Sequence, residues 1–279
     1  MSTLKIAGIT FMEARWRKIA WAVVVLGFAF LVVFGVGFYF MWREISRFND
    51  VASVRALEPV NFFILIGFYG IAFLAVALAL LISVDTVAGE IASGTIQTLV
   101  TKPLRRWEVI VGKWLGLGLM LSAFTVVMSA ALIVIVYGIT RYLPPNPAPA
   151  IALIVLEGLV VLTLSILGGT RLPALANGVV IFMLYGLAFI AGWIEQIGAM
   201  LRNEAAINTG IVVSLIMPSE AMWKRAAYLL QPPMLRELGL DFTAFGAAST
   251  PSPIMVGYTV VYIVALLLLA IHLFNTRDL

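Results

Sequence analysis

The sequence contains no cysteine and a single histidine, His272, among its 279 residues. Without cysteine, the chain can form neither a disulfide framework nor a thiolate zinc site, and one histidine cannot make a histidine cluster for a metal. Charged residues are also scarce, at 11% of the chain, whereas soluble globular proteins usually contain about a quarter. These shortages exclude cysteine redox chemistry and argue against a water-soluble protein.

Long hydrophobic runs make up most of the chain, of which 62% is hydrophobic. A helix that rises 1.5 Å per residue needs about 20 apolar residues to cross the roughly 30 Å hydrocarbon core of a bilayer. The sequence has six runs of this kind, at residues 19–42, 60–84, 114–139, 150–169, 175–194 and 254–274. It therefore predicts an all-α, polytopic membrane protein with six transmembrane helices, in which residues 1–279 form a single transmembrane domain.

The basic residues predict the orientation of these spans, because Lys and Arg in short loops accumulate on the cytoplasmic side of a membrane. If the N-terminus is inside, the inner segments contain ten basic and five acidic residues, and the outer segments contain eight of each. The net charge is then +5 inside and 0 outside, and Glu157 within a span completes the total of +4. We expect a multi-pass protein of the cell (inner, cytoplasmic) membrane with both termini in the cytoplasm.

Two segments outside the runs have amphipathic patterns. Residues 1–18 predict an N-terminal helix lying in the membrane interface, with one apolar stripe formed by Ile9, Met12 and Trp16. Residues 195–253 contain a second amphipathic region, and we expect this extracytoplasmic segment to lie on the outer face of the bilayer or to re-enter it. Lys224 and Arg225 are then expected to contact lipid headgroups.

The most informative segment is the loop between the second and third runs, residues 85–113. Ile96, Leu99 and Val100 form one apolar face at i, i+3 and i+4, and Pro103 ends the short helix that this spacing predicts. The apolar face can be a docking surface for a partner, or it can rest on the bilayer or on neighbouring helices. The periodicity alone leaves both interpretations open.

The order of residue types in this loop is more specific than its periodicity. Along the chain, the loop has an acidic residue, a Gly-Thr pair, the apolar helix, a basic residue before Pro and a Gly-Lys pair. The residues that carry this pattern are Glu90, Gly94, Thr95, Leu99, Lys102, Pro103, Arg106, Glu108, Gly112, Lys113 and Gly116. This order and spacing resemble the cytoplasmic loop of the ABC type-2 exporter permeases. The pair Ala92-Ser93 departs from the pattern, since many relatives have a charged or aromatic residue before the Gly.

The resemblance implies that the loop is a cytoplasmic coupling helix, received in a cleft of a separate ATP-binding-cassette ATPase subunit. The residues that it implicates in ATPase coupling are Glu90, Gly94, Thr95, Ile96, Leu99, Lys102, Pro103 and Arg106. It further implies the permease subunit of an exporter, in which two ATPase copies work with two permeases, as a homodimer or a heterodimer, in the lipid bilayer. ATP and magnesium are then bound by the ATPase, and this chain has no cofactor, metal, catalytic residue or nucleic-acid partner of its own.

The nucleotide site is expected elsewhere because a Walker A loop needs Gly-x-x-x-x-Gly-Lys-Ser/Thr to cradle phosphate. The pair Gly112-Lys113 is followed by Trp114 and lacks the first Gly of that motif. Asp85 and Glu90 resemble a catalytic carboxylate pair. With basic residues nearby, they are instead expected to form salt bridges within the loop, to Arg105, Arg106 or Lys113.

Glu157 is the only charged residue within a predicted span. Exposure to lipid would cost roughly 2.5–3.5 kcal/mol on insertion scales, so its side chain is expected to face protein or water. It is a candidate for the translocation path or the dimer seam. Alternatively, it lies near the outer end of its span and reaches the interface.

Three other functions compete with an ABC permease. A secondary transporter usually has ionisable groups or broken helices at midplane, and this chain offers little beyond Glu157. An intramembrane enzyme needs a nucleophile with a base, and Ser122, Ser129 and Ser165 have no histidine within a plausible helix partner. A non-transporting membrane anchor is the alternative that the sequence excludes least.

Overall fold

The structure is a computed structural model, and it describes residues 2–16, 18–48, 54–92, 105–237 and 250–276. The regular elements of these residues are all α-helices, and six of them are long and apolar enough to cross a membrane. Those six are α2 (Lys18–Phe48), α3 (Val54–Ala92), α5 (Arg106–Thr140), α6 (Pro147–Gly169), α7 (Ala174–Leu201) and α11 (Pro253–Asn275). Each contains one of the six hydrophobic runs, so the prediction of an all-α protein with six membrane-spanning helices is confirmed.

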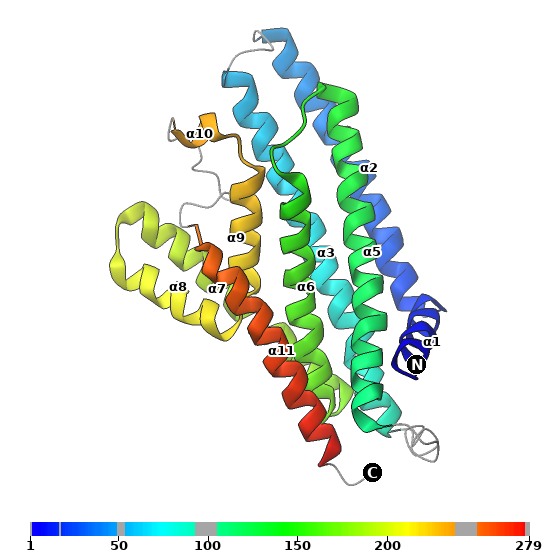
Figure 1. The fold of residues 1–279 in the computed structure, drawn as a ribbon. Helices are drawn as coiled ribbons and strands as arrows, with labels where there is room; N and C mark the ends of the chain where they lie inside the picture. Colours follow the sequence, from blue (N-terminus) through cyan, green and yellow to red (C-terminus); the bar gives the residue numbers. More distant parts are fainter. Residues whose placement is uncertain (1, 17, 49–53, 93–104, 238–249, 277–279) are drawn as a thin grey trace.

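The six spans alternate in direction, and one end of each lies in the lower part of Figure 1. At this end of the molecule, which we call the terminal end, lie α1 (Ser2–Trp16), the start of α5 and the end of α11. Arg106 Nη1 donates a hydrogen bond to Asn275 O over 3.2 Å, and Arg171 Nη2 donates one to Thr276 Oγ1 over 3.1 Å. Because a helix C-terminus carries partial negative charge, both arginines stabilise the end of α11.

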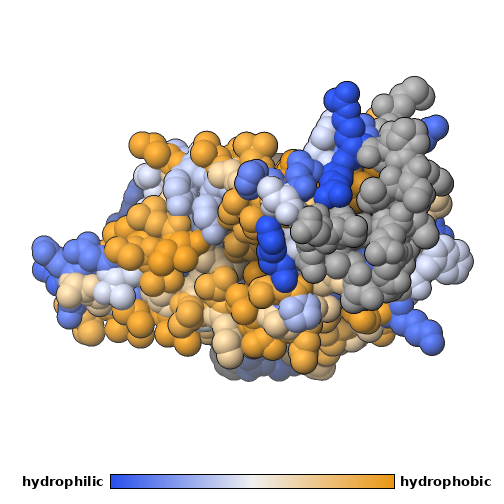
Figure 2. Space-filling view, turned by 90° about the horizontal axis from the view of Figure 1, so that it is seen from below, coloured by the Kyte–Doolittle hydropathy of each residue, from blue (hydrophilic) through white to orange (hydrophobic). Residues whose placement is uncertain are grey.

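Helix α6 lies at the centre of the bundle and packs against α3, α5, α11 and α9 (Ser219–Leu230). Leu78 of α3, Leu121 of α5 and Val160 of α6 belong to one fully buried core cluster. Many exposed side chains of α2, α7 and α11 are large and apolar, as expected for helices whose outer faces contact lipid. Figure 2 views the terminal end and shows hydrophobic surface over much of this face.

Helix α1 packs along the first half of α5. Two glycines of α5 permit this close approach, because a Cβ at Gly112 would collide with Ile6 and a Cβ at Gly116 would collide with the backbone oxygen of Ala7. The opposite side of α1 is exposed and contains the predicted apolar stripe, Ile9, Met12 and Trp16. The N-terminal segment is therefore a helix, and its position in the membrane interface stays a prediction.

The region after the fifth run differs from expectation. Helix α7 continues beyond residue 194 to Leu201, and α8 (Glu204–Ile216) folds back along it. Helices α8 and α9 then meet at 110°, as in a broken span or a re-entrant pair, and α10 (Pro233–Glu237) follows. Lys224, expected at lipid headgroups, is 2% exposed and pairs with Glu195, so that prediction was wrong. The amphipathic pattern was correct, but the polar face of α9 is turned toward α7 instead of the membrane surface.

Candidate functional site

The candidate site consists of the two helix ends that flank residues 93–104. Six of the eight predicted ATPase-coupling residues fall outside the described residues: Gly94, Thr95, Ile96, Leu99, Lys102 and Pro103. The other two are placed by the structure, Glu90 near the end of α3 and Arg106 at the start of α5. We call the last two turns of α3 and the first two turns of α5 the loop arms.

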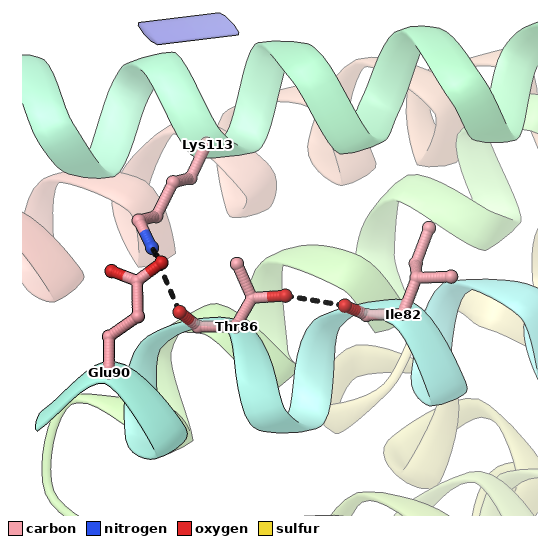
Figure 3. A network of polar contacts seen from close by, with 4 residues as sticks. All are labelled: Ile82, Thr86, Glu90 and Lys113. Carbon is pink, nitrogen blue, oxygen red and sulfur yellow. Dashed lines mark hydrogen bonds and ion pairs between the residues drawn. The ribbon is translucent and has the colours of Figure 1, made fainter. Parts of the chain in front are cut away.

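A buried lysine connects the two loop arms (Figure 3). Lys113 of α5 forms an ion pair with Glu90 of α3, and its Nζ also donates a hydrogen bond to Thr86 O over 2.8 Å. The side chain of Lys113 is 5% exposed and that of Glu90 is 18% exposed. The ammonium also opposes the partial negative charge at the C-terminus of α3. Removing either partner would take an ion pair away from a largely buried charge, so these contacts hold the loop arms in one relative position.

This pairing agrees with the expectation that Glu90 forms a salt bridge within its loop. The first turn of α5 adds a local contact, because the backbone N–H of Arg105 donates to Glu108 Oε2 over 3.1 Å. An acidic residue in the first turn of a helix is favoured by the partial positive charge there. Arg106, predicted to take part in ATPase coupling, has its guanidinium against the end of α11.

The start of α5 is also fixed to α6. Trp114 Nε1 donates a hydrogen bond to Thr163 Oγ1 over 2.8 Å, and that hydroxyl in turn donates to Leu159 O. Together with the glycine contacts to α1, the Lys113 pair to α3 and the Arg106 bond to α11, this links one stretch of α5 to four other helices. A displacement of the loop arms would therefore be passed to much of the bundle.

Glu157 lies near the middle of α6 and is 1% exposed. Its Oε1 accepts a hydrogen bond from the hydroxyl of Tyr185 on α7 over 3.5 Å, whereas its Oε2 has no hydrogen-bond partner among the described residues. This burial contradicts the alternative in which Glu157 reaches the interface. The side chain faces protein, as the cost of exposing a carboxylate to lipid requires.

Comparison with protein families decides the identity of the chain. The sequence model described as "ABC-2 family transporter protein" matches residues 4–279. The chain belongs to the ABC-2 transporter family. A comparison with curated proteins gives no match. The resemblance drawn from the loop sequence is thereby confirmed, and family membership makes the chain a permease subunit that works with an ATP-binding ABC ATPase subunit.

The ABC-2 permease contains a second buried ion pair, which sequence reasoning missed. Lys224 Nζ of α9 lies 2.7 Å from Glu195 Oε2 of α7, and both side chains are almost fully buried. In the sequence Glu195 marks the polar boundary of the fifth run, although it is an interior residue of α7. The sequence contains one sign that Lys224 lies among carboxyl groups and not at lipid headgroups. Glu220 precedes Lys224 by one turn, and an acid and a base at i and i+4 share one helix face.

Proposed function

We propose that this ABC-2 permease is the membrane subunit of an ATP-driven exporter in the cell membrane. Two permeases, identical or different, assemble with two ATPase subunits, which bind the ATP and magnesium. Both termini and residues 93–104 lie in the cytoplasm. The excess of basic residues in the segments assigned to that side supports this orientation.

The observation that carries the proposal is the ion pair between Lys113 and Glu90 across the loop arms. A coupling helix transmits force only if its two flanking helices move together. The Lys113 contacts to Glu90 and Thr86 link α3 to α5 next to residues 93–104, and α5 is linked in turn to α1, α6 and α11. Closure of the ATPase subunits would then move these helices as one body.

Glu157 belongs, in this proposal, beside the translocation path or the permease dimer seam. A hollow of about 250 Å³ lies between α3, α6 and α7, and its lining is almost entirely apolar. Tyr185 lines this hollow and reaches Glu157 behind it. Unchanged ATPase stimulation and transport in Glu157→Gln would remove the residue from the path.

The loop itself is tested with Leu99→Glu, which places a charge on the predicted apolar face. Recovery of the ATPase subunit with the affinity-purified permease is expected to fall at least about tenfold, because a docking surface that buries a carboxylate loses more than about 1.4 kcal/mol. Nucleotide hydrolysis of the reconstituted complex should lose its stimulation by the permease.

Thr98→Glu is the matched control, since it adds the same charge to the adjacent residue, off the predicted face. It should leave assembly and stimulation near the unmodified level. If both variants assembled normally with the ATPase subunit, docking through Leu99 would be contradicted. If the unmodified complex assembled normally but showed no ATPase stimulation, a non-transporting anchor would be favoured.

A further inference from the structure

A cavity of about 260 Å³ lies away from the loop arms, between α7, α8, α9 and the start of α11. Residues from these four helices and from the segment before α11 line it, including Glu195, Ser214, Ala221, Pro251, Ser252 and Met255. Its side toward α8 is formed by Ile211 and Leu215, both of which are also exposed on the outer surface. The cavity therefore lies next to an exposed apolar surface of α8.

The polar side chains that line this cavity all offer oxygen atoms. They are the carboxylate of Glu195 and the hydroxyls of Ser214, Thr250 and Ser252. Within the described part of the chain, none of the three hydroxyls has a hydrogen-bond partner, and Lys224 contacts only Oε2 of Glu195. The carboxylate only accepts hydrogen bonds, and each hydroxyl has two acceptor lone pairs and one donor. A lining with this excess of acceptors and no side-chain nitrogen suits a ligand that brings N–H donors, such as a primary ammonium.

Charged groups lie on two sides of the cavity. On the α7 and α9 side, the carboxylate of Glu195 lines the cavity and is paired with the ammonium of Lys224, while burial raises the pKa of the neighbouring Glu220 to about 7. On the α11 side, Arg225 Nη1 donates a hydrogen bond to Pro251 O over 2.8 Å, which places a guanidinium beside the lining. The cavity thus has the carboxylate of Glu195 in one wall and the guanidinium of Arg225 at its rim, an arrangement that complements a zwitterion.

We propose that this cavity binds the phosphoethanolamine headgroup of phosphatidylethanolamine. The ammonium points to Glu195 and the free hydroxyls, and the phosphate lies toward Arg225. Helix α11 has 23 residues, so at 1.5 Å per residue it spans about 35 Å and its first turn lies at headgroup depth when its last turn is at the other interface. The exposed apolar side chains of α8 give the acyl chains a surface to lie on. The site is separate from the loop arms and does not depend on the proposed coupling.

The test is native mass spectrometry of the full-length permease released from nanodiscs that contain equal amounts of phosphatidylethanolamine and phosphatidylcholine. The choline headgroup has the same charges but no N–H donor, so the unmodified protein is expected to retain the ethanolamine lipid about tenfold more. Ser214→Trp, which fills the cavity and leaves Lys224 and Glu195 in the sequence, should abolish this preference.

Val212→Trp is the matched control, because Val212 lies on the exposed side of the same helix and does not line the cavity; it should keep the preference. Ser214→Ala removes one hydroxyl without adding bulk, and is expected to lower the preference about threefold, as the loss of one hydrogen bond predicts. Equal retention of the two lipids by the unmodified protein, or an unchanged preference in both Ser214 variants, would overturn the site. If soluble phosphoethanolamine displaces the lipid, the site binds the free headgroup compound and the proposal of a lipid ligand is overturned. Retention of the lipid supports the proposal.

Discussion

Lys113 and Lys224 are both almost completely buried in a membrane domain, and each is paired with a carboxylate from another helix. An ammonium in this environment costs several kcal/mol unless an anion compensates it. The two pairs therefore specify helix neighbours, with Lys113 linking α5 to α3 and Lys224 linking α9 to α7. The Lys113 pair lies at the loop arms, whereas the Lys224 pair lies beside the proposed lipid site. Substitution of the two lysines is therefore expected to affect different parts of the molecule.

Replacement of Lys113 by Met is expected to destabilise the purified permease by about 3 kcal/mol, because it leaves Glu90 without its ammonium partner. The partial exposure of Glu90 keeps the effect at the lower end of the range for buried pairs. Denaturation in detergent, followed by tryptophan fluorescence, measures the change. Combining Lys113→Met with Glu90→Gln should recover part of the loss, as expected for residues that interact directly.

Lys18→Met controls for the loss of a positive charge, since Lys18 is exposed at the start of α2. It should leave stability nearly unchanged. If Lys113→Met were as stable as this control, the pair would not hold the loop arms together.

The two ion pairs also differ in how far the sequence could predict them. Glu90 and Lys113 flank one short loop, so the pairing follows from the loop's own charges. Glu195 and Lys224 are 29 residues apart and meet only because α8 reverses along α7 and then bends by 110° into α9. Pro218 predicts a break between two helices, but no pattern in the sequence reports the angle between them, and for this reason the sequence predicts an exposed segment around Glu195 and Lys224.

At the scale of whole elements, glycine spacing in α5 determines where α1 lies. Gly116 faces the backbone of Ala7, whereas a Cβ added at Gly138 of the same helix would meet no atom within 4 Å. The packing therefore leaves no room for a side chain at Gly116 and leaves open space for one at Gly138.

Gly116→Leu is expected to displace α1 from α5, and Gly138→Leu is expected to leave the packing intact. Hydrogen exchange of residues 2–16 measures the difference, and protection there should fall by an order of magnitude or more in the first variant, since local opening exposes the backbone amides. Equal protection in both variants would show that α1 does not depend on this contact.

The elements themselves were largely predictable, because about 20 consecutive apolar residues can only be placed as a spanning helix. Each of the six runs lies inside an observed helix. The boundary of α7 was missed because an acid such as Glu195 ordinarily ends an apolar run, and only its pairing with Lys224 makes an acid acceptable there. The predicted coupling helix falls on residues 93–104, outside the described residues, and its structure stays a prediction.

For the whole molecule, the arrangement of basic residues and the absence of cysteine allow a direct test of orientation. The terminal end gathers Arg106 and Arg171 at the end of α11, and α1 adds Lys5 and Arg15 on its exposed side. Positive charge of this kind resists translocation, so we expect the terminal end in the cytoplasm. Residues of the α7–α8 turn then lie on the opposite side, together with the proposed lipid site.

Because the natural chain has no cysteine, each single introduced thiol reports its own position. Lys102→Cys in the loop and Ala205→Cys at the exposed start of α8 form the pair to compare. A membrane-impermeant maleimide added to intact cells should label Ala205→Cys and spare Lys102→Cys, and both should react once the cells are opened. Labelling of Lys102→Cys from outside would put residues 93–104 beyond the reach of an ATPase that binds cytoplasmic ATP, and would remove the physical basis for coupling. Failure of Ala205→Cys to react in intact cells, with reaction after the cells are opened, would contradict the placement of the α7–α8 turn on the outer side.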